Sequence, residues 1–131
     1  MKLFAFIICL VTANTCFALT PEEFEQEYVR LKSELNRAVL QNAIDSRDYN
    51  DEKIPEEEKF QSQSSWCKLA KKRVNLLDFV VKNYPDYKEL MKKNNQDDDS
   101  TLKDFKKFYK SQNAMYLRLN DALKDTEYKC E

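Results

Sequence analysis

The sequence predicts an all-α fold, a small antiparallel helical bundle of about four helices with one disulfide. The first observation behind this prediction is that none of the 131 residues is glycine. Glycine favours tight hairpins and phosphate-binding loops, so its absence disfavours a β-rich fold and excludes the glycine-rich nucleotide motifs. The second observation is that apolar residues recur at steps of three and four in successive segments, as they do on one face of a helix.

The first predicted helix covers residues 21–44. Thr20 suits the N-cap, Pro21 the first helical position, and Glu23 the third position of a capping box. The residues that follow place an apolar stripe on one helical face: Phe24, Tyr28, Leu31, Leu35, Ala38 and Val39. The polar stretch 45–54 interrupts this pattern and is predicted to be a connection.

The second predicted helix begins at Pro55 and ends near Asn83. The acidic run 56–58 suits a helix start, because carboxylates favour the positive end of the helix dipole. The first turns, through Ser65, are polar and are expected to fray. The segment 66–81 is apolar over a broad face, which predicts that this helix is the most buried element.

Two further helices complete the predicted bundle. Proline disfavours helical geometry in the residue before it, so a short third helix is expected at about residues 86–94, beginning at Pro85. The fourth helix is expected to begin at Ser100 or Thr101, both of which suit an N-cap. Apolar residues then recur at steps of three and four through residues 102–123.

The first 18 residues have the three parts of a secretory signal. Lys2 precedes the apolar run 3–11, and a small-residue cleavage site ends at Ala18. The apolar run is shorter than the about 20 residues that a membrane-spanning helix needs. We therefore expect residues 1–18 to be removed and residues 19–131 to form a single exported domain without membrane insertion.

The four cysteines predict one disulfide. Cys9 and Cys16 would leave with the signal, whereas Cys67 and Cys130 would enter an oxidising compartment as a pair. If the fourth helix packs antiparallel to the second, the residues just beyond its end arrive beside the early turns of the second helix. This geometry fits a Cys67–Cys130 bridge that acts as a structural staple.

Charge is distributed unevenly along the predicted domain. Residues 19–65 carry 6 basic and 12 acidic side chains, whereas residues 66–131 carry 15 and 11. Four lysines share one side of the fourth predicted helix by their spacing: Lys103, Lys106, Lys107 and Lys110. Such a strip could bind a sulfated glycan or an acidic protein surface, or could simply be a solvated face. No nucleic-acid motif accompanies it, so no nucleic-acid partner is expected.

Two aromatic residues, Tyr49 and Phe60, fall outside the clean apolar stripes. They flank the polar region 51–58. Aromatic side chains exposed in a loop can anchor a protein interface. Tyr49 and Phe60 are therefore further candidates for partner contact.

The composition argues against catalysis. There is no histidine, which removes the commonest general base near neutral pH and the commonest zinc ligand. With Cys67 and Cys130 oxidised, a cysteine nucleophile is missing as well. The acidic run 97–99 lacks the alternating oxygen ligands and the glycine of an EF-hand calcium loop. We expect no catalytic residue, no metal site and no cofactor.

Four segments carry a resemblance to a known group of proteins: the signal 1–18, the opening 19–24, the stretch 66–69 and the closing 128–131. In format the chain resembles the short helical salivary proteins of blood-feeding insects. It is similar in particular to anopheline complement inhibitors related to the helical C-terminal domain of mosquito antiplatelet proteins. The resemblance implies a secreted, non-enzymatic inhibitor of host complement or haemostasis that binds a host plasma protein.

A second function is compatible with the residues themselves. A helical bundle lined by many aromatic side chains could enclose an apolar ligand between its helices. The alternative to a protein-binding inhibitor is therefore a secreted helical carrier of a small apolar molecule.

Overall fold

The computed structural model describes residues 18–46, 52–96 and 98–130. Four helices make up most of this part of the chain: α1 (Pro21–Asp45), α2 (Glu56–Lys82), α3 (Tyr84–Lys93) and α4 (Leu102–Leu123). None of the described residues lies in a strand. The predicted all-α bundle is confirmed. Residues 1–17 lie outside the described ranges, so removal of the signal stays a prediction.

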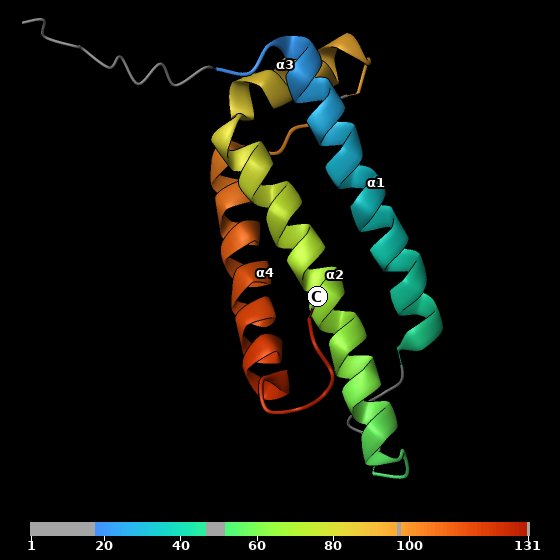
Figure 1. The fold of residues 1–131 in the computed structure, drawn as a ribbon. Helices are drawn as coiled ribbons and strands as arrows, with labels where there is room; N and C mark the ends of the chain where they lie inside the picture. The colour runs from blue at the N-terminus through green and yellow to red at the C-terminus, as the bar shows by residue number, and fades with distance from the viewer. Residues whose placement is uncertain (1–17, 47–51, 97, 131) are drawn as a thin grey trace, which may run out of the picture.

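Helix α2 is the central element of the bundle (Figure 1). It packs against α1 along one side and against α4 along another, and both neighbours run antiparallel to it. Helix α3 lies across the end where α2 finishes and α1 begins. Helices α1 and α4 make little or no contact with each other. Each outer helix therefore buries one face against α2 and turns another face outward.

Capping boxes fix the starts of α1 and α4. In α1 the Glu23 backbone N–H donates to Thr20 Oγ1 at 3.2 Å, and the Thr20 N–H donates to Glu23 Oε2 at 2.8 Å. In α4 the Asp104 N–H donates to Thr101 Oγ1 at 3.3 Å, and the Thr101 N–H donates to Asp104 Oδ2 at 2.9 Å. The box predicted at Thr20 is confirmed, and Thr101 is the N-cap of α4.

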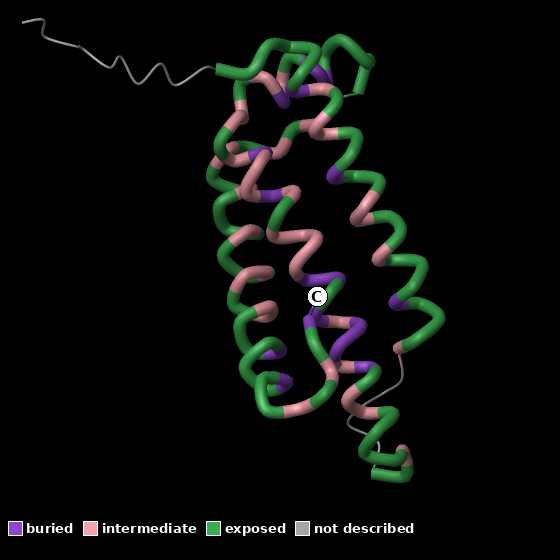
Figure 2. Tube along the Cα trace, in the orientation of Figure 1, coloured by how far each residue is buried: buried purple, intermediate pink, exposed green. Residues whose placement is uncertain are grey.

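Buried residues concentrate on α2 (Figure 2). This helix contributes eight of them, against three each from α1 and α3 and two from α4. The prediction that the second helix is the most buried element is confirmed. Its central place explains this result, because two of its sides are covered by neighbouring helices.

One core cluster, the aromatic end, joins α1, α2, α3 and the start of α4. Its buried members are Phe24, Val80, Tyr87, Leu90 and Met91. The Phe24 ring stacks on Phe79 with 5.1 Å between centroids, and Tyr87 meets Phe105 edge-on at 5.2 Å. Such ring pairs stabilise the fold by more than the burial of their apolar area alone.

A second core cluster, the disulfide end, lies where α4 finishes. Its buried members are Cys67, Leu119, Leu123 and Cys130. The disulfide joins Cys67 of α2 to Cys130, with 5.3 Å between the Cα atoms, a separation usual for natural disulfides. The predicted bridge is present because the chain beyond α4 turns back along α2, as antiparallel packing requires.

The prediction that α2 frays through Ser65 is wrong. Ser62, Ser64 and Ser65 are buried, with 0%, 6% and 8% of their surfaces exposed. Their small side chains allow close approach of neighbouring backbone, and their hydroxyls find partners: Asn42 Nδ2 of α1 donates to Ser65 Oγ at 3.2 Å. In the sequence these serines suggest a solvated turn. In the fold they form the surface through which α2 contacts its neighbours.

Helix α3 begins earlier than predicted, at Tyr84, and Pro85 occupies its second position. Proline opposes helical geometry at the preceding residue, but other contacts hold Tyr84 in place. Its hydroxyl donates to the Ser100 carbonyl oxygen at 2.7 Å, and its ring lies 6.0 Å from that of Phe105. Tertiary contacts with the segment before α4 and with α4 itself therefore outweigh the local preference.

Candidate interaction surfaces

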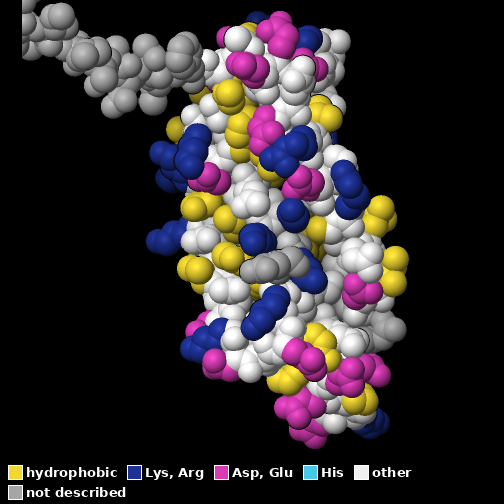
Figure 3. Space-filling model, viewed as in Figure 1, with side chains coloured by type: hydrophobic (Ala, Val, Ile, Leu, Met, Phe, Trp, Pro, Cys, Tyr) yellow, Lys and Arg dark blue, Asp and Glu magenta, His cyan; other side chains and the backbone are white. Residues whose placement is uncertain are grey.

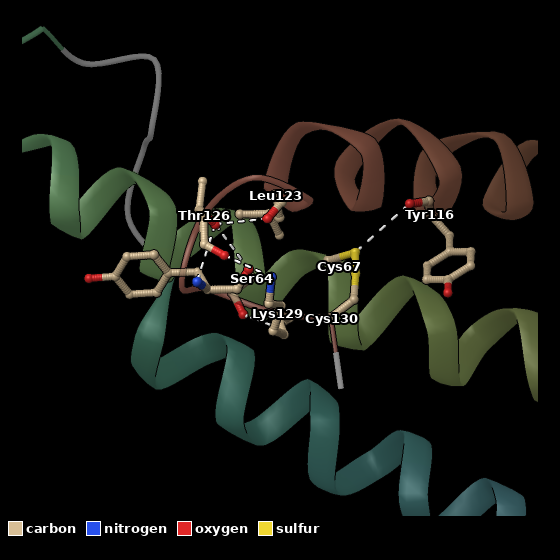
Figure 4. The surroundings of a disulfide bond; sticks show 8 residues. Ser64, Cys67, Tyr116, Leu123, Thr126, Lys129 and Cys130 are labelled. Carbon is tan, nitrogen blue, oxygen red and sulfur yellow. Dashed lines mark hydrogen bonds between the residues drawn. A yellow bond between two sulfur atoms is a disulfide. The ribbon is translucent and has the colours of Figure 1, made fainter.

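The segment 124–130 folds back along the first half of α2 (Figure 4). Besides the disulfide, Ser64 Oγ donates to the Lys129 carbonyl oxygen at 2.6 Å. The Phe60 ring stacks on Tyr128 with 5.9 Å between centroids. The segment is therefore held at three successive levels of α2.

A groove of about 810 Å³ lies where the end of α1, the early turns of α2 and the C-terminal segment meet. Most residues that line it carry a polar group; they are Gln41, Ile44, Asp45, Glu58, Gln61, Ser64, Ser65, Lys68 and Tyr128. Partial burial, with a smaller effect from Glu57, raises the pKa of the Tyr128 phenol above its ordinary value. The groove suits hydrogen bonding more than the enclosure of an apolar ligand.

Helix α1 carries an exposed apolar face. Val29, Leu40 and Ile44 are 57%, 67% and 68% exposed. They lie about 140° to 180° around the helix from the buried residues Phe24, Leu31 and Asn42, by helical geometry. Figure 3 shows hydrophobic side chains along the edge that α1 forms. We call Val29, Leu40 and Ile44 the outer apolar face.

The outer apolar face is not among the features predicted from the sequence. Its members are separated by eleven and four residues, or about three turns and one turn, so their spacing contained the signal. The apolar stripe through Phe24 and Leu31 is sufficient to predict the helix, so the other apolar residues of this segment add nothing to that prediction. Only the packing shows that α2 covers the first stripe and leaves the second in solvent.

Acidic side chains lie beside the outer apolar face and the groove. Asp45 ends α1, and Glu56, Glu57 and Glu58 begin α2; all four are exposed. Figure 3 shows this acidic group at the tip of the molecule where α2 begins. The three glutamates also favour the helix start, because they lie at the positive end of its dipole. We call these four residues the acidic rim.

The lysine strip predicted on α4 forms one exposed line. Lys103, Lys106, Lys107 and Lys110 are all exposed and lie roughly opposite the buried residue Leu119 on the helix. Figure 3 shows basic side chains projecting along the edge that α4 forms. Among the described residues, none of the four lysines makes an ion pair within 4.0 Å.

The acidic residue nearest the strip in sequence has another task. Hydrogen bonds from Thr101 are the main reason why the pKa of Asp104 lies below its ordinary value, and Lys103 and Lys107 add smaller effects. Asp104 is thus committed to the capping box of α4. It offsets only part of the positive charge of the strip.

Unlike the lysine strip, two basic residues on α2 form contacts within the bundle. Lys72 Nζ lies 2.7 Å from Glu34 Oε2, and this hydrogen bond is the main cause that lowers the pKa of Glu34. Arg73 Nη1 donates to Gln112 Oε1 at 3.4 Å. These contacts tie α2 to α1 and to α4, so this basic group contributes to the bundle itself.

Of the two aromatic candidates for partner contact, only Phe60 lies in the described part of the chain. Tyr49 lies outside the described residues. Phe60 lies within α2, half-buried, and stacks on Tyr128. It is not in a loop, and its ring helps to hold the C-terminal segment. Contact of either residue with a partner stays a prediction.

The acidic connection before α4 is held by its own neighbours. Asp98 Oδ2 accepts a hydrogen bond from the Tyr87 hydroxyl, and Oδ1 accepts one from the Ser100 N–H at 2.8 Å. Lys88 Nζ donates to the Asp98 carbonyl oxygen. The hydrogen bond from Tyr87 is the main cause that lowers the pKa of Asp98, while burial and this same bond raise that of Tyr87. This cluster closes the aromatic end.

Two further properties concern the described part of the chain alone. It holds no group of three or more carboxylate, cysteine or histidine side chains placed to bind a metal ion. Within residues 18–46, 52–96 and 98–130, no helix has an apolar stretch long enough to cross a membrane.

Comparison with protein-family models, curated proteins and solved structures finds no match to this chain. The resemblance to insect salivary proteins therefore stays a prediction. The features that bear on function are the outer apolar face, the acidic rim, the groove and the lysine strip.

Proposed function

We propose that this protein is a secreted, non-enzymatic effector that binds an extracellular protein and blocks it stoichiometrically. The contact is the outer apolar face of α1 with its acidic rim. The partner presents an apolar ridge bordered by basic side chains. A host plasma protein of complement or haemostasis is the class that the sequence resemblance implies.

The outer apolar face is the observation that carries the proposal. Burying one valine, leucine or isoleucine side chain completely contributes about 1.5 to 3 kcal/mol. Val29, Leu40 and Ile44 are already partly covered, so each has about 1 to 2 kcal/mol left to contribute. A few such anchors dominate the affinity of a typical protein interface.

The acidic rim supports a partner with basic residues around its apolar ridge. Charges at the edge of an interface contribute little affinity, but they steer the encounter and disfavour partners of like charge. Asp45 and the three glutamates that begin α2 would act in this way. Association should therefore slow as salt is added, because salt screens exposed charges.

The alternative of an apolar-ligand carrier has less support. A carrier needs a concave site lined mainly by apolar side chains. Most residues that line the groove beside α1 carry a polar group. A smaller hollow between α1 and α3 has apolar residues in its lining, but its volume of about 210 Å³ is below that of a typical ligand pocket. The binding protein is therefore preferred.

The test is capture of a plasma protein by the immobilised mature chain, compared with a Val29→Ser/Leu40→Ser/Ile44→Ser variant. The expected result is a stoichiometric complex whose affinity falls at least 100-fold in the variant, since three partial burials are lost. The wild-type chain should also inhibit complement activation or clotting in that plasma, and the variant should not.

The matched control changes three exposed apolar residues elsewhere, Leu19, Phe108 and Leu117, to serine. These are 39%, 50% and 55% exposed. The control should keep the affinity of the wild type. The proposal is wrong if both triple variants lose binding equally, or if the α1 variant binds and inhibits as the wild type does.

A further inference from the structure

We infer that the lysine strip on α4 is a second binding site, for a linear sulfated glycan. Lys103, Lys106, Lys107 and Lys110 span eight residues, a line of about 10 Å along the helix axis. This site is separate from the outer apolar face, because α1 and α4 make little or no contact and lie on different sides of α2.

The strip is unfavourable for the folded protein by itself. Its members form four like-charge pairs at spacings of three and four residues, and such pairs destabilise a helix. Lys103 also lies in the first turn of α4, where the helix dipole opposes a positive charge. A sequence selected for stability alone would have no reason to gather these charges here.

Other lysines of the chain have their positive charge offset by a nearby carboxylate. Lys72, Lys82, Lys93 and Lys124 each lie within 2.9 Å of a carboxylate oxygen. The four lysines of the strip have no such neighbour among the described residues, and Asp104 is held by Thr101. An external polyanion would supply the negative charges that these four lysines lack within the described part of the chain.

The shape of the strip favours a charged chain over a folded acidic protein. Protein interfaces are centred on aromatic or apolar anchors, and lysine is depleted from them. No apolar side chain lies on this line between Lys103 and Lys110; the half-exposed Phe108 lies about 100° around the helix from Lys107, and Leu117 lies about two turns beyond Lys110. A linear chain with regularly placed sulfates can contact successive lysines without a desolvated anchor.

The test is binding of the full mature chain to heparin, the most highly sulfated common glycan, at several salt concentrations. Release of counterions by four lysines predicts a slope of about −3 for the logarithm of the binding constant against that of salt. Affinity should therefore fall roughly 50-fold between 50 and 200 mM salt. Heparin from which the sulfates have been removed should bind at least ten times more weakly.

The decisive variant changes Lys103, Lys106, Lys107 and Lys110 to glutamine. Heparin affinity at 150 mM salt should fall at least tenfold, while the melting temperature should stay the same or rise, because the like-charge pairs are removed. If the melting temperature rises while heparin affinity falls, the four lysines serve binding and not the stability of the fold.

The matched control changes four exposed basic residues outside α4, Lys32, Arg37, Lys68 and Lys92, to glutamine. This removes the same net charge, and affinity should stay within about twofold of the wild type. Equal loss in both variants, equal binding of desulfated heparin, or tighter binding to anionic lipid vesicles would each overturn the inference. None of these outcomes bears on the α1 contact, since the plasma test uses different residues.

Discussion

The two ends of the bundle are held together by different means. At the aromatic end, large rings from α1, α2, α3 and α4 interlock, and no covalent link is involved among the described residues. At the disulfide end, the Cys67–Cys130 bridge lies in an apolar cluster with Leu119 and Leu123, and three buried serines of α2 form contacts beside it. Serines bury little apolar area, so contacts made through them contribute little hydrophobic stabilisation. The disulfide end therefore combines apolar packing with a covalent link, whereas the aromatic end depends on packing alone.

The largest effect is expected at the aromatic end. Phe24 is 1% exposed and stacks on both Tyr28 and Phe79. Phe24→Ala removes this packing and leaves a cavity, so the free energy of unfolding should fall by about 3 to 5 kcal/mol. Urea denaturation measures the change. A loss below about 1 kcal/mol would show that the rings are not the main support of this end.

The disulfide end should respond to loss of its bridge. Cys67→Ala/Cys130→Ala opens a loop whose ends are 63 residues apart, and the free energy of unfolding should fall by about 2 to 5 kcal/mol. Amide exchange should speed up first in segment 124–130, because the remaining contacts there are the Ser64 hydrogen bond and the Phe60–Tyr128 stack. Unchanged stability and exchange would contradict the role of a staple.

A bulkier side chain should expose the dependence of this end on small residues. Ser65→Leu forces extra volume between α2 and α1 and removes the partner of the Asn42 amide. The free energy of unfolding should fall by about 1 to 3 kcal/mol. Thermal unfolding measures it, with Ser33→Leu at an exposed position of α1 as the control. Equal effects would mean that burial of the serine is unimportant.

Acid should loosen the aromatic end selectively, with the smallest effect. The folded pKa of Asp98 lies below the ordinary carboxyl value of 3.8, so its charge stabilises the fold above that pH and ceases to do so as the pH falls. Asp98→Asn should therefore cost up to about 1 kcal/mol at pH 7 and less at pH 2, because the stabilisation declines as the pH falls below 3.8. Urea midpoints at the two pH values test this. An equal cost at both would contradict the assignment.

The sequence predicted the elements of the fold because their signals are local. Thr20 and Glu23 lie three residues apart, and the capping box between them follows from that spacing. Cys67 and Cys130 were the only pair left once the signal is removed. The lysine strip was also predictable, because a helix places residues three and four apart on one side.

The rest depends on long-range packing. Ser62, Ser64 and Ser65 look solvated until α1 and the C-terminal segment cover them. The outer apolar face is distinguishable from the buried stripe of α1 only when α2 is in place. The groove likewise exists because segment 124–130 turns back, a path that no local pattern encodes.

The central position of α2 makes the two outer surfaces thermodynamically independent. Substitutions with no shared neighbours usually have additive effects on stability. Helices α1 and α4 each contact α2 but hardly meet each other, so a change on the outer face of one leaves the surroundings of the other intact. Selection can therefore retune either surface for a new partner, residue by residue, without losing what the opposite surface has acquired.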